Sequence, residues 1–463
     1  MDVQYEAGMH AGLKCCFDSG RTRSAEWRIT QLQGLEAFLK RRESAIARAI
    51  HADFRKSSAE SWLTETSYLL SEIRHVRRHL RRWMKPRRVP VPLHYQPGRA
   101  MVTREPLGVV LIIGAWNYPL QLCLAPLIGA IAGGNCAVVK PSELAPETSR
   151  LLATELASYV DASAIMVVEG GQDETRELLR YRFDHIFFTG SRQKGGEVMH
   201  AAAEHLTPVT LELGGKCPCL VTESADLKRA ARRIVWAKFL NAGQTCISPD
   251  YLLVHESVEK PLLELMRSAL DRFYGSDPME SPDYARVVDD RQFDRLRGYL
   301  REGDIVAGGA VDPAQRYIAP TIIRGVTPHS RLMKEEMFGP VLPVLTVSSL
   351  AQATEIVRNG GEPLAIYLFS RDSADLRFLR ERTLSGGICC NDLLFHASIM
   401  GLPFGGRGMS GTGAYHGQAG FETFTASRSV LVRSGGLPDP DLRYPPYGEG
   451  KMRLLRRIVN LFS

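Results

Sequence analysis

Apolar residues recur at helical spacing through residues 24–84, where glycine and proline are almost absent, and this pattern predicts a series of helices. Leu35, Phe38, Leu39 and Ile46, for example, lie three, four or seven positions apart. A dense basic run begins inside this region and continues just past it: Arg74, Arg77, Arg78, Arg81, Arg82, Lys85, Arg87 and Arg88. It lacks the aromatic and glycine pattern of an RNA-binding module. A solvated face or a contact with an anionic surface is therefore favoured over nucleic acid.

The pattern changes at Leu107 to short apolar runs that alternate with segments of helix length. We expect strands at 108–114, 135–140, 164–170 and 184–190, and helices near 119–132, 146–158 and 173–181. Continuous apolar strands separated by helices are typical of a parallel sheet covered on both faces. This part of the chain is predicted to be a doubly wound α/β domain of the dinucleotide-binding type.

A second α/β cycle is predicted after Gly215. Its expected helices lie at about 226–240 and 257–273, and its strands at 218–224, 251–256, 317–323, 341–347, 364–370 and 386–392. With 463 residues, the chain is long enough for roughly two or three domains.

Composition adds limits to this picture. Hydrophobic residues make up 44% and charged residues 24%, which excludes a disordered chain or a fibre, and a net charge of +7 is too small to indicate a nucleic-acid binder. The nine cysteines have no zinc-site spacing, so no metal is expected. The N-terminus lacks the pattern of a signal peptide, and no apolar run of about 18 residues occurs. A cytoplasmic protein with free thiols is the expectation.

Polar residues in two otherwise apolar segments are the first candidates for chemistry. Asn117 follows a predicted strand, where its amide could stabilise an oxyanion, although a turn asparagine before proline would look the same. Glu212 lies inside an apolar strand, where burial should raise its pKa and suit it to act as a general base. A structural buried acid is the alternative.

Three further motifs are each weak by themselves. Cys246 lies in NAGQTC on a turn, where it is either a reactive thiol or an inert buried one. The stretch FTGSRQKG at 188–195 has only a loose resemblance to a nucleotide loop. EEMFGP at 335–340 has paired acids followed by an aromatic residue, a glycine and a proline, and by itself it indicates no more than a plain turn.

Together and in this order, the motifs closely resemble those of the aldehyde dehydrogenase superfamily. LELGGK and GQTC, with Glu212 and Cys246 34 residues apart, are similar to its two active-site signatures, and EEMFGP and LPFGG are further hallmarks. The resemblance runs from about residue 20 to 447. It is specific to the class 3 branch, which is indicated by WNYP, KPSE, RYIAPT, AYHG, FETF and RYPPY.

This resemblance implies an NAD(P)-dependent oxidation of medium or long aliphatic, or aromatic, aldehydes to carboxylic acids. Cys246 would attack the aldehyde, Asn117 and the Cys246 amide would hold the oxyanion, and Glu212 would activate water. The implied cofactor residues are Trp116, Lys140, Glu143, Gly190, Ser191, Arg192, Gln193, Lys194, Gly195, Glu336 and Phe338, and the implied substrate residues are Tyr68 and Trp236. NAD is expected to be preferred and NADP tolerated, because Glu143 would bind the ribose 2′-hydroxyl and repel a 2′-phosphate.

Two positions depart from the family pattern. The basic stretch Arg192-Gln193-Lys194 is expected to strengthen contact with phosphate. Cys217 stands where serine or asparagine is more common and is a poor donor, so weaker ordering around the site is expected. Two other functions stay open: an acyl-CoA-linked reductase relative, against which the presence of Glu212 argues, and a non-catalytic protein on the same scaffold.

The resemblance also implies the aldehyde dehydrogenase fold, an α/β fold with a Rossmann-like cofactor domain, an α/β catalytic domain and a small oligomerisation arm that forms a homodimer. The expected ranges are 1–85 and 105–211 for the cofactor domain with its N-terminal helices, 212–400 for the catalytic domain, 86–104 and 421–436 for the arm, and 448–463 for a C-terminal tail.

The tail at 451–463 is predicted to be an amphipathic helix with basic and apolar faces, too short to span a membrane. A peripheral contact with an anionic membrane is one expectation, and docking on the protein's own dimer is the other.

Overall fold

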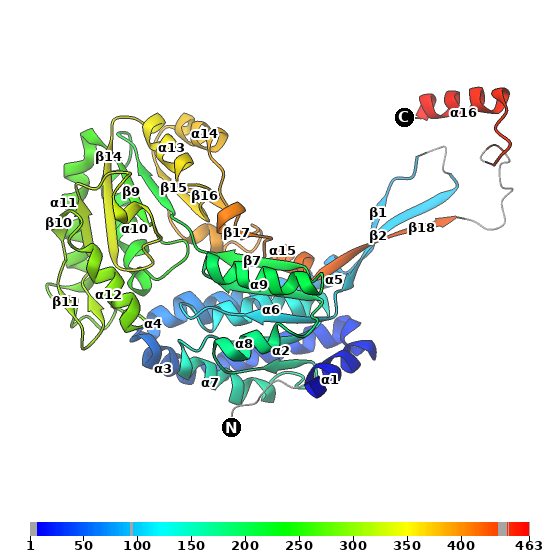
Figure 1. Cartoon of the computed structure of the whole chain (residues 1–463), viewed down its shortest axis with the longest axis horizontal. Helices are drawn as coiled ribbons and strands as arrows, with labels where there is room; N and C mark the ends of the chain where they lie inside the picture. Colours follow the sequence, from blue (N-terminus) through cyan, green and yellow to red (C-terminus); the bar gives the residue numbers. More distant parts are fainter. Residues whose placement is uncertain (1–6, 93–95, 434–441, 443, 463) are drawn as a thin grey trace.

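The computed structural model describes residues 7–92, 96–433, 442 and 444–462. Parts of the predicted ranges, namely 1–6 of the cofactor domain, 93–95 and 434–436 of the arm, and residue 463 of the tail, lie outside the described residues. Two α/β bodies lie side by side, and a narrow β arm projects from one of them (Figure 1).

The first body is a six-stranded sheet in the order β17-β7-β6-β3-β4-β5, parallel except for β17. Its strands are β3 (Val109–Ile113), β4 (Cys136–Lys140), β5 (Ile165–Val167), β6 (His185–Gly190), β7 (Val209–Leu213) and β17 (Gly411–Thr412). The five parallel strands have the order 3-2-1-4-5 of a dinucleotide-binding sheet without its sixth strand, with a topological switch point between β3 and β6. The doubly wound α/β prediction is confirmed. The predicted boundary at 211/212 falls inside β7, all of which pairs with β6.

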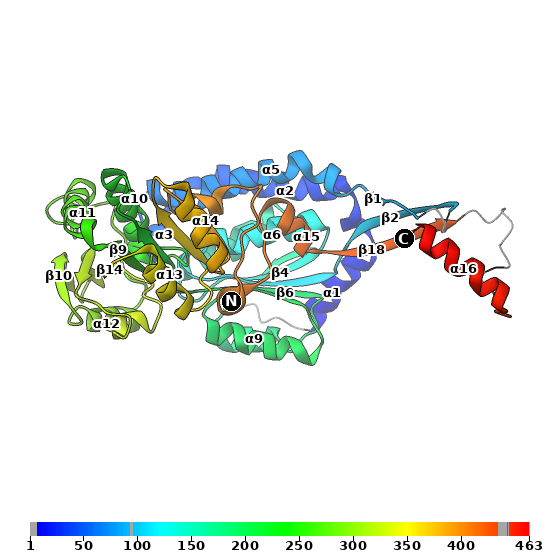
Figure 2. The same cartoon turned by 90° about the horizontal axis from the view of Figure 1, so that it is seen from above.

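Helices cover both faces of this sheet, α6 on one and α9 on the other, with α5 and α2 outside α6 (Figure 2). α6 is apolar all round because it is buried on every side. The helices of this body are α1 (Ala7–Asp18), α2 (Ala25–Arg41), α3 (Glu43–Phe54), α4 (Ser58–Ser61), α5 (Ser67–Trp83), α6 (Gln121–Gly133), α7 (Pro146–Glu155), α8 (Gln172–Leu178), α9 (Arg192–Glu204) and α15 (Gly417–Thr423).

The position of α5 explains why apolar and basic residues alternate so regularly in its sequence: one face is buried and the other is exposed. Leu69, Ile73 and Leu80 are fully buried, whereas Arg74, Arg78, Arg82 and other members of the basic run are exposed. Two arginines of the run pair with acids on α2, because Arg77 bonds Glu36 and Arg81 lies 3.0 Å from Glu26. A basic face thus remains on the outside of α5.

The second body is a seven-stranded sheet in the order β10-β13-β14-β9-β8-β15-β16, parallel except for β10. Its strands are β8 (Pro218–Val221), β9 (Tyr251–His255), β10 (Asp304–Ala307), β13 (Thr321–Arg324), β14 (Val341–Val347), β15 (Ala365–Phe369) and β16 (Gly387–Cys390). Its helices are α10 (Leu227–Phe239), α11 (Glu259–Tyr274), α12 (Asp290–Tyr299), α13 (Leu350–Asn359) and α14 (Ser373–Arg382).

The single strand predicted at 317–323 is wrong in detail. It is two strands, β12 (Tyr317–Ile318), which pairs with β11 (Val311–Asp312), and β13 in the large sheet. Pro320 lies between them, and because proline has no N–H it cannot continue a ladder.

The projecting arm is a three-stranded antiparallel sheet of β1 (Arg87–Val89), β2 (Gly98–Pro106) and β18 (Thr425–Arg433). β18 therefore brings the distant segment 425–433 against 98–106, and α16 (Glu449–Phe462) lies at the same end of the molecule (Figures 1 and 2). Among the described residues, no helix is both long and apolar enough to cross a membrane.

Candidate active site

Cys246 follows a tightly wound turn at the end of α10. Asn241, Ala242 and Gly243 all have left-handed φ angles, of 53°, 51° and 74°. A Cβ at Gly243 would lie 2.2 Å from the Gly339 carbonyl oxygen, so only glycine fits there. The side chain of buried Gln244 donates to the carbonyls of Asn241 and Arg286, both at 3.0 Å. The backbone next to Cys246 is thus fixed from both sides.

The Cys246 thiol is half-buried and protonated at neutral pH. Burial raises its pKa to about 12, and the nearby carboxylates of Glu212 and Glu336 add to the rise, while backbone N–H groups of Cys246 and Ile247 oppose it. The thiol must therefore lose its proton when substrate is present in order to act as a nucleophile.

Glu212 lies on β7, opposite Thr189 of β6 and Gly411 of β17. Its carboxyl group is buried, and neither oxygen has a hydrogen-bond partner among the described residues. Burial raises its pKa well above the ordinary range, as expected from the sequence. A buried, unpartnered carboxyl group with a raised pKa near the thiol is placed to exchange a proton with water or substrate.

Asn117 reaches the cysteine turn from the other sheet. It follows β3, and its Nδ2 donates to the Gln244 carbonyl oxygen at 3.0 Å, two residues before Cys246. The neighbouring Tyr118 hydroxyl lies 2.6 Å from Thr245 Oγ1. Asn117, Glu212 and Cys246 thus converge from three separate segments.

The predicted cofactor residues lie along the carboxyl edge of the first sheet. Lys140 ends β4, and its buried Nζ donates to the Pro141 carbonyl at 2.8 Å and to that of Gly170. Burial lowers the pKa of Lys140, while the charge of nearby Glu143 opposes this shift. Gly190 ends β6, next to the switch point where α/β sheets bind ligands.

The turn after Gly190 opens directly into α9. Ser191 caps this helix by accepting from the Lys194 N–H at 3.4 Å. Arg192 and Gln193 are exposed at the helix start, whereas the Lys194 ammonium lies 2.8 Å from Glu197. Gly195 allows close packing, since a Cβ there would lie 2.6 Å from Leu213.

Glu336 and Phe338 approach the same edge from the second body. The Glu336 carboxylate lies against Gly214 and accepts from the Gly215 N–H. Burial and the charge of Asp250 raise its pKa to about 8. The Phe338 ring packs edge-on against Trp116, with centroids 5.3 Å apart.

Tyr68 and Trp236 both contact the turn Phe395–Ser398. The Tyr68 hydroxyl lies 2.6 Å from a ring nitrogen of His416 and donates to the Ala397 carbonyl at 3.1 Å. Trp236 stacks on Phe395 with centroids 5.6 Å apart. Several large apolar side chains in and around this turn are exposed: Phe395, Ile399 and Leu402.

The residues that the sequence did not single out fall into two groups. Gln244 and His416 lie within the recognised motifs GQTC and AYHG but carried no role, and Phe395 lies in no motif at all.

Cys217, which was flagged as a poor donor, donates its thiol to the Cys246 carbonyl oxygen at 3.4 Å. The Cys246 carbonyl therefore does have a partner.

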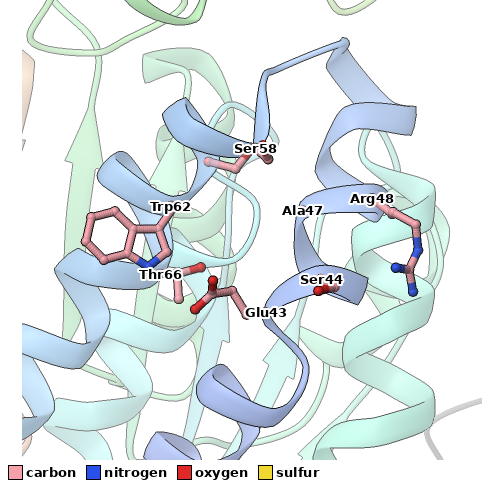
Figure 3. Close-up of a pocket in the computed structure, with 8 residues that line it drawn as sticks. Glu43, Ser44, Ala47, Arg48, Ser58, Trp62 and Thr66 are labelled. Carbon is pink, nitrogen blue, oxygen red and sulfur yellow. The ribbon is translucent and has the colours of Figure 1, made fainter.

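A separate hollow of about 280 Å³ lies between α3 and the segment 58–66. Trp62 and Thr66 from this segment and Glu43 and Ser44 from α3 line it (Figure 3). None of the predicted site residues lines it. Among the described residues, no group of three or more histidine, cysteine or acidic side chains is placed to hold a metal ion.

Comparison with known proteins places this geometry in context. The model of the aldehyde dehydrogenase family matches residues 8–430. Aldehyde dehydrogenase family 3 member B1 of Homo sapiens is 46% identical over 444 residues, covering 96% of this chain and 95% of that protein. The dimeric NADP-preferring aldehyde dehydrogenase of Canis lupus familiaris is 45% identical over 435 residues, covering 94% and 96%. The substrate-bound AldH of Staphylococcus aureus superposes with a TM-score of 0.95 at 41% identity, covering 98% of this chain and 99% of that one.

Proposed function

This chain belongs to the aldehyde dehydrogenase family and is an NAD(P)-dependent oxidoreductase, and from that premise we propose that Cys246, Asn117 and Glu212 carry its chemistry. The observation that supports these roles is the convergence of the three side chains from β3, β7 and the turn after α10. Their roles are testable one by one.

In this mechanism Cys246 gives up its thiol proton to water, and the thiolate sulfur bonds to the aldehyde carbon while the carbonyl π electrons move to oxygen, which forms a thiohemiacetal. The negative charge on the former carbonyl oxygen is stabilised by Asn117 Nδ2 and the Cys246 N–H, which are held in place before the reaction begins. A bound NAD(P)⁺ would supply the hydride acceptor for this site, and loss of hydride from the thiohemiacetal carbon would leave Cys246 as a thioester. The Glu212 carboxylate takes a proton from water, the hydroxide adds to the thioester carbon, and the cysteine leaves as thiolate while the carboxylic acid is released.

The carboxyl edge of the first sheet fits a dinucleotide. The α9 N-terminus at Ser191 presents N–H groups that suit a pyrophosphate, and the buried Thr189 hydroxyl beside it has no partner among the described residues. Lys140 and Glu143 would hold the adenosine ribose, Glu336 the nicotinamide ribose, and Phe338 and Trp116 would pack near the nicotinamide.

NAD is expected to be the better cofactor and NADP a tolerated one, because the exposed Glu143 carboxylate repels a 2′-phosphate. Glu143→Gln should raise kcat/KM for NADP by roughly tenfold and lower it for NAD, since one charge repulsion and one charged hydrogen bond are lost. Steady-state kinetics with both cofactors measure this. A large NADP preference in the unmodified enzyme would contradict the role given to Glu143.

The substrates are proposed to be medium or long aliphatic aldehydes and aromatic aldehydes. Trp236, Phe395 and nearby apolar side chains supply an apolar surface, and each buried CH₂ contributes about 0.8 kcal/mol. In a series of linear aldehydes, kcat/KM should therefore rise by about threefold or fourfold per methylene until the surface is filled. A series in which kcat/KM is flat with chain length, or falls from acetaldehyde onward, would contradict substrate binding on this apolar surface.

A homodimer is proposed through the arm of β1, β2 and β18. Within the described part of the chain, the outer edges of β1 and β18 pair with no further strand, so they can extend a sheet of a second copy. A relative of similar length is named as dimeric, which supports the same assembly.

The protein is further proposed to be cytoplasmic, with a reversible membrane contact through α16. All nine cysteines are free thiols, consistent with a reducing compartment. On α16, Arg453, Arg456 and Arg457 are exposed, and so is Leu454, which belongs to the apolar half of the helix. Such a helix suits the surface of an anionic bilayer.

Full-length protein should sediment with anionic phosphatidylserine vesicles at low salt, and a chain that ends at Tyr447 should stay in the supernatant. Each basic residue near the surface contributes about 1 kcal/mol, so reversing Arg453, Arg456 and Arg457 to glutamate should weaken binding at least roughly 100-fold. Equal recovery of full-length and shortened protein in the supernatant would show that α16 belongs to the fold or the dimer.

A further inference from the structure

A fully buried ion pair lies beneath the proposed oxyanion site. Lys56, in the turn between α3 and α4, has its Nζ 3.1 Å from Glu65 Oε1, and neither side chain is exposed to solvent. Glu65 lies on the single π-helical turn Trp62–Thr66, which connects α4 to α5. A buried ion pair recovers the cost of losing water only when further hydrogen bonds satisfy both groups.

Those further hydrogen bonds all go to one short segment, residues 117–121. Glu65 Oε2 accepts from the N–H groups of Leu120 at 2.9 Å and Gln121 at 3.1 Å, at the start of α6. A carboxylate there is also stabilised by the helix dipole. Lys56 Nζ donates to the Asn117 carbonyl at 3.4 Å and lies 4.3 Å from the centroid of the Tyr118 ring.

The same segment is bonded directly to the cysteine turn. Asn117 Nδ2 and the Tyr118 hydroxyl bond Gln244 and Thr245, as described above. The Asn117 carbonyl has one other donor, Asn241 Nδ2 at 2.7 Å. Lys56 therefore bonds the backbone of Asn117 itself, whereas Glu65 holds Lys56 and bonds the backbone three and four residues further on, at Leu120 and Gln121.

We propose that Lys56 and Glu65 are positioning residues that hold the Asn117 amide where the oxyanion forms. This inference rests on the proposed role of Asn117. An oxyanion donor contributes about 10²–10³-fold to rate, but only when its position is fixed beforehand, and a misplacement of about 1 Å forfeits much of it. The ion pair fixes the backbone at Asn117 itself and again three and four residues later, at the start of α6.

Two reactions of Cys246 separate positioning from general damage, and neither requires the cofactor. Acylation by p-nitrophenyl acetate passes through an oxyanion, whereas alkylation by iodoacetamide does not. Lys56→Met should slow acylation by about 10- to 100-fold and leave alkylation within about twofold. Lys14→Met, which removes a lysine from an exposed pair with Asp18 at 2.9 Å, is the matched control and should change neither rate.

Coupling to Asn117 is measured in a double-mutant cycle. In the Asn117→Ala background, Lys56→Met should slow acylation by less than about threefold, because the donor it positions is already gone. An undiminished effect in that background, or a parallel loss of alkylation, would overturn the proposal. If Asn117→Ala alone leaves acylation unchanged, it is the role of Asn117 that fails.

Glu65→Gln keeps the shape of the side chain and tests the pair if Lys56→Met does not fold. It retains an acceptor for the α6 N–H groups but loses the charge that holds Lys56. Acylation should therefore be slowed, as it is in Lys56→Met. Lys56→Arg, which keeps the charge, should recover part of the rate. A Glu65→Gln enzyme with unchanged acylation would show that the ion pair has no positioning role.

Discussion

Cys246→Ala is expected to abolish aldehyde oxidation, with a loss of about 10⁴-fold or more, because the reaction then lacks the atom that bonds to the substrate. Binding of NAD should remain, since the groups proposed to hold its adenosine ribose and pyrophosphate, Lys140 at the end of β4 and the turn between β6 and α9, do not depend on the thiol. Initial rates of NADH formation and a direct NAD-binding titration measure the two effects.

The matched control for this substitution is Cys389→Ala. Cys389 is also a half-buried thiol, and burial raises its pKa to about 11, but it lies on β16, where it bonds the backbone of the turn Phe395–Ser398 and has no proposed role in the chemistry. Its activity should stay close to that of the unmodified enzyme. Comparable activity in Cys246→Ala and Cys389→Ala would remove Cys246 from the mechanism.

Glu212→Gln is expected to release one equivalent of NADH per active site and then to stall, with the steady-state rate lower by about 10²–10⁴-fold. The amide cannot accept the proton of water, so the thioester accumulates while the steps before it continue. Rapid mixing of enzyme, NAD and aldehyde records the burst and the plateau separately. A burst that is lost in parallel with turnover would show that Glu212 also activates the thiol.

The pH dependence follows from the raised pKa of Glu212. Below that pKa the carboxyl group is protonated and cannot take a proton from water, and above it the carboxylate can. The rate of thioester hydrolysis in the unmodified enzyme should therefore rise with pH through this pKa. Glu212→Gln should lose that rise while its residual rate stays low.

Much of the fold was predictable because the apolar pattern is strong where the sheets are buried. All five residues of β3 are fully buried, so the continuous run GVVLIIG predicted a parallel strand correctly. α5 was predictable because its apolar and basic faces are cleanly separated. β17 was not predictable, because it has only two residues and its place beside β7 depends on the chain returning from the second body.

In the candidate site, too, some residues were predictable from the sequence and others only from the three-dimensional packing. Glu212, Asn117 and Cys246 were identified because each lies in a distinctive motif, and the structure brings them together. Lys56 and Glu65 were missed because isolated charged residues in a helical segment look like a solvated face. Only the packing of the N-terminal helices against the 117–121 segment reveals that both are fully buried.

The most direct test of the central claim is the intact mass of Glu212→Gln after a single turnover with NAD and a medium-chain aldehyde such as octanal. The proposed mechanism predicts one acyl group per chain, attached to the peptide that contains Cys246 and removed by hydroxylamine. Loss of this adduct in the Cys246→Ala, Glu212→Gln double variant would complete the result. Two results would contradict catalysis through Cys246. One is an acyl group on any other residue, and the other is release of NADH with no acyl adduct detected before the thioester is expected to hydrolyse.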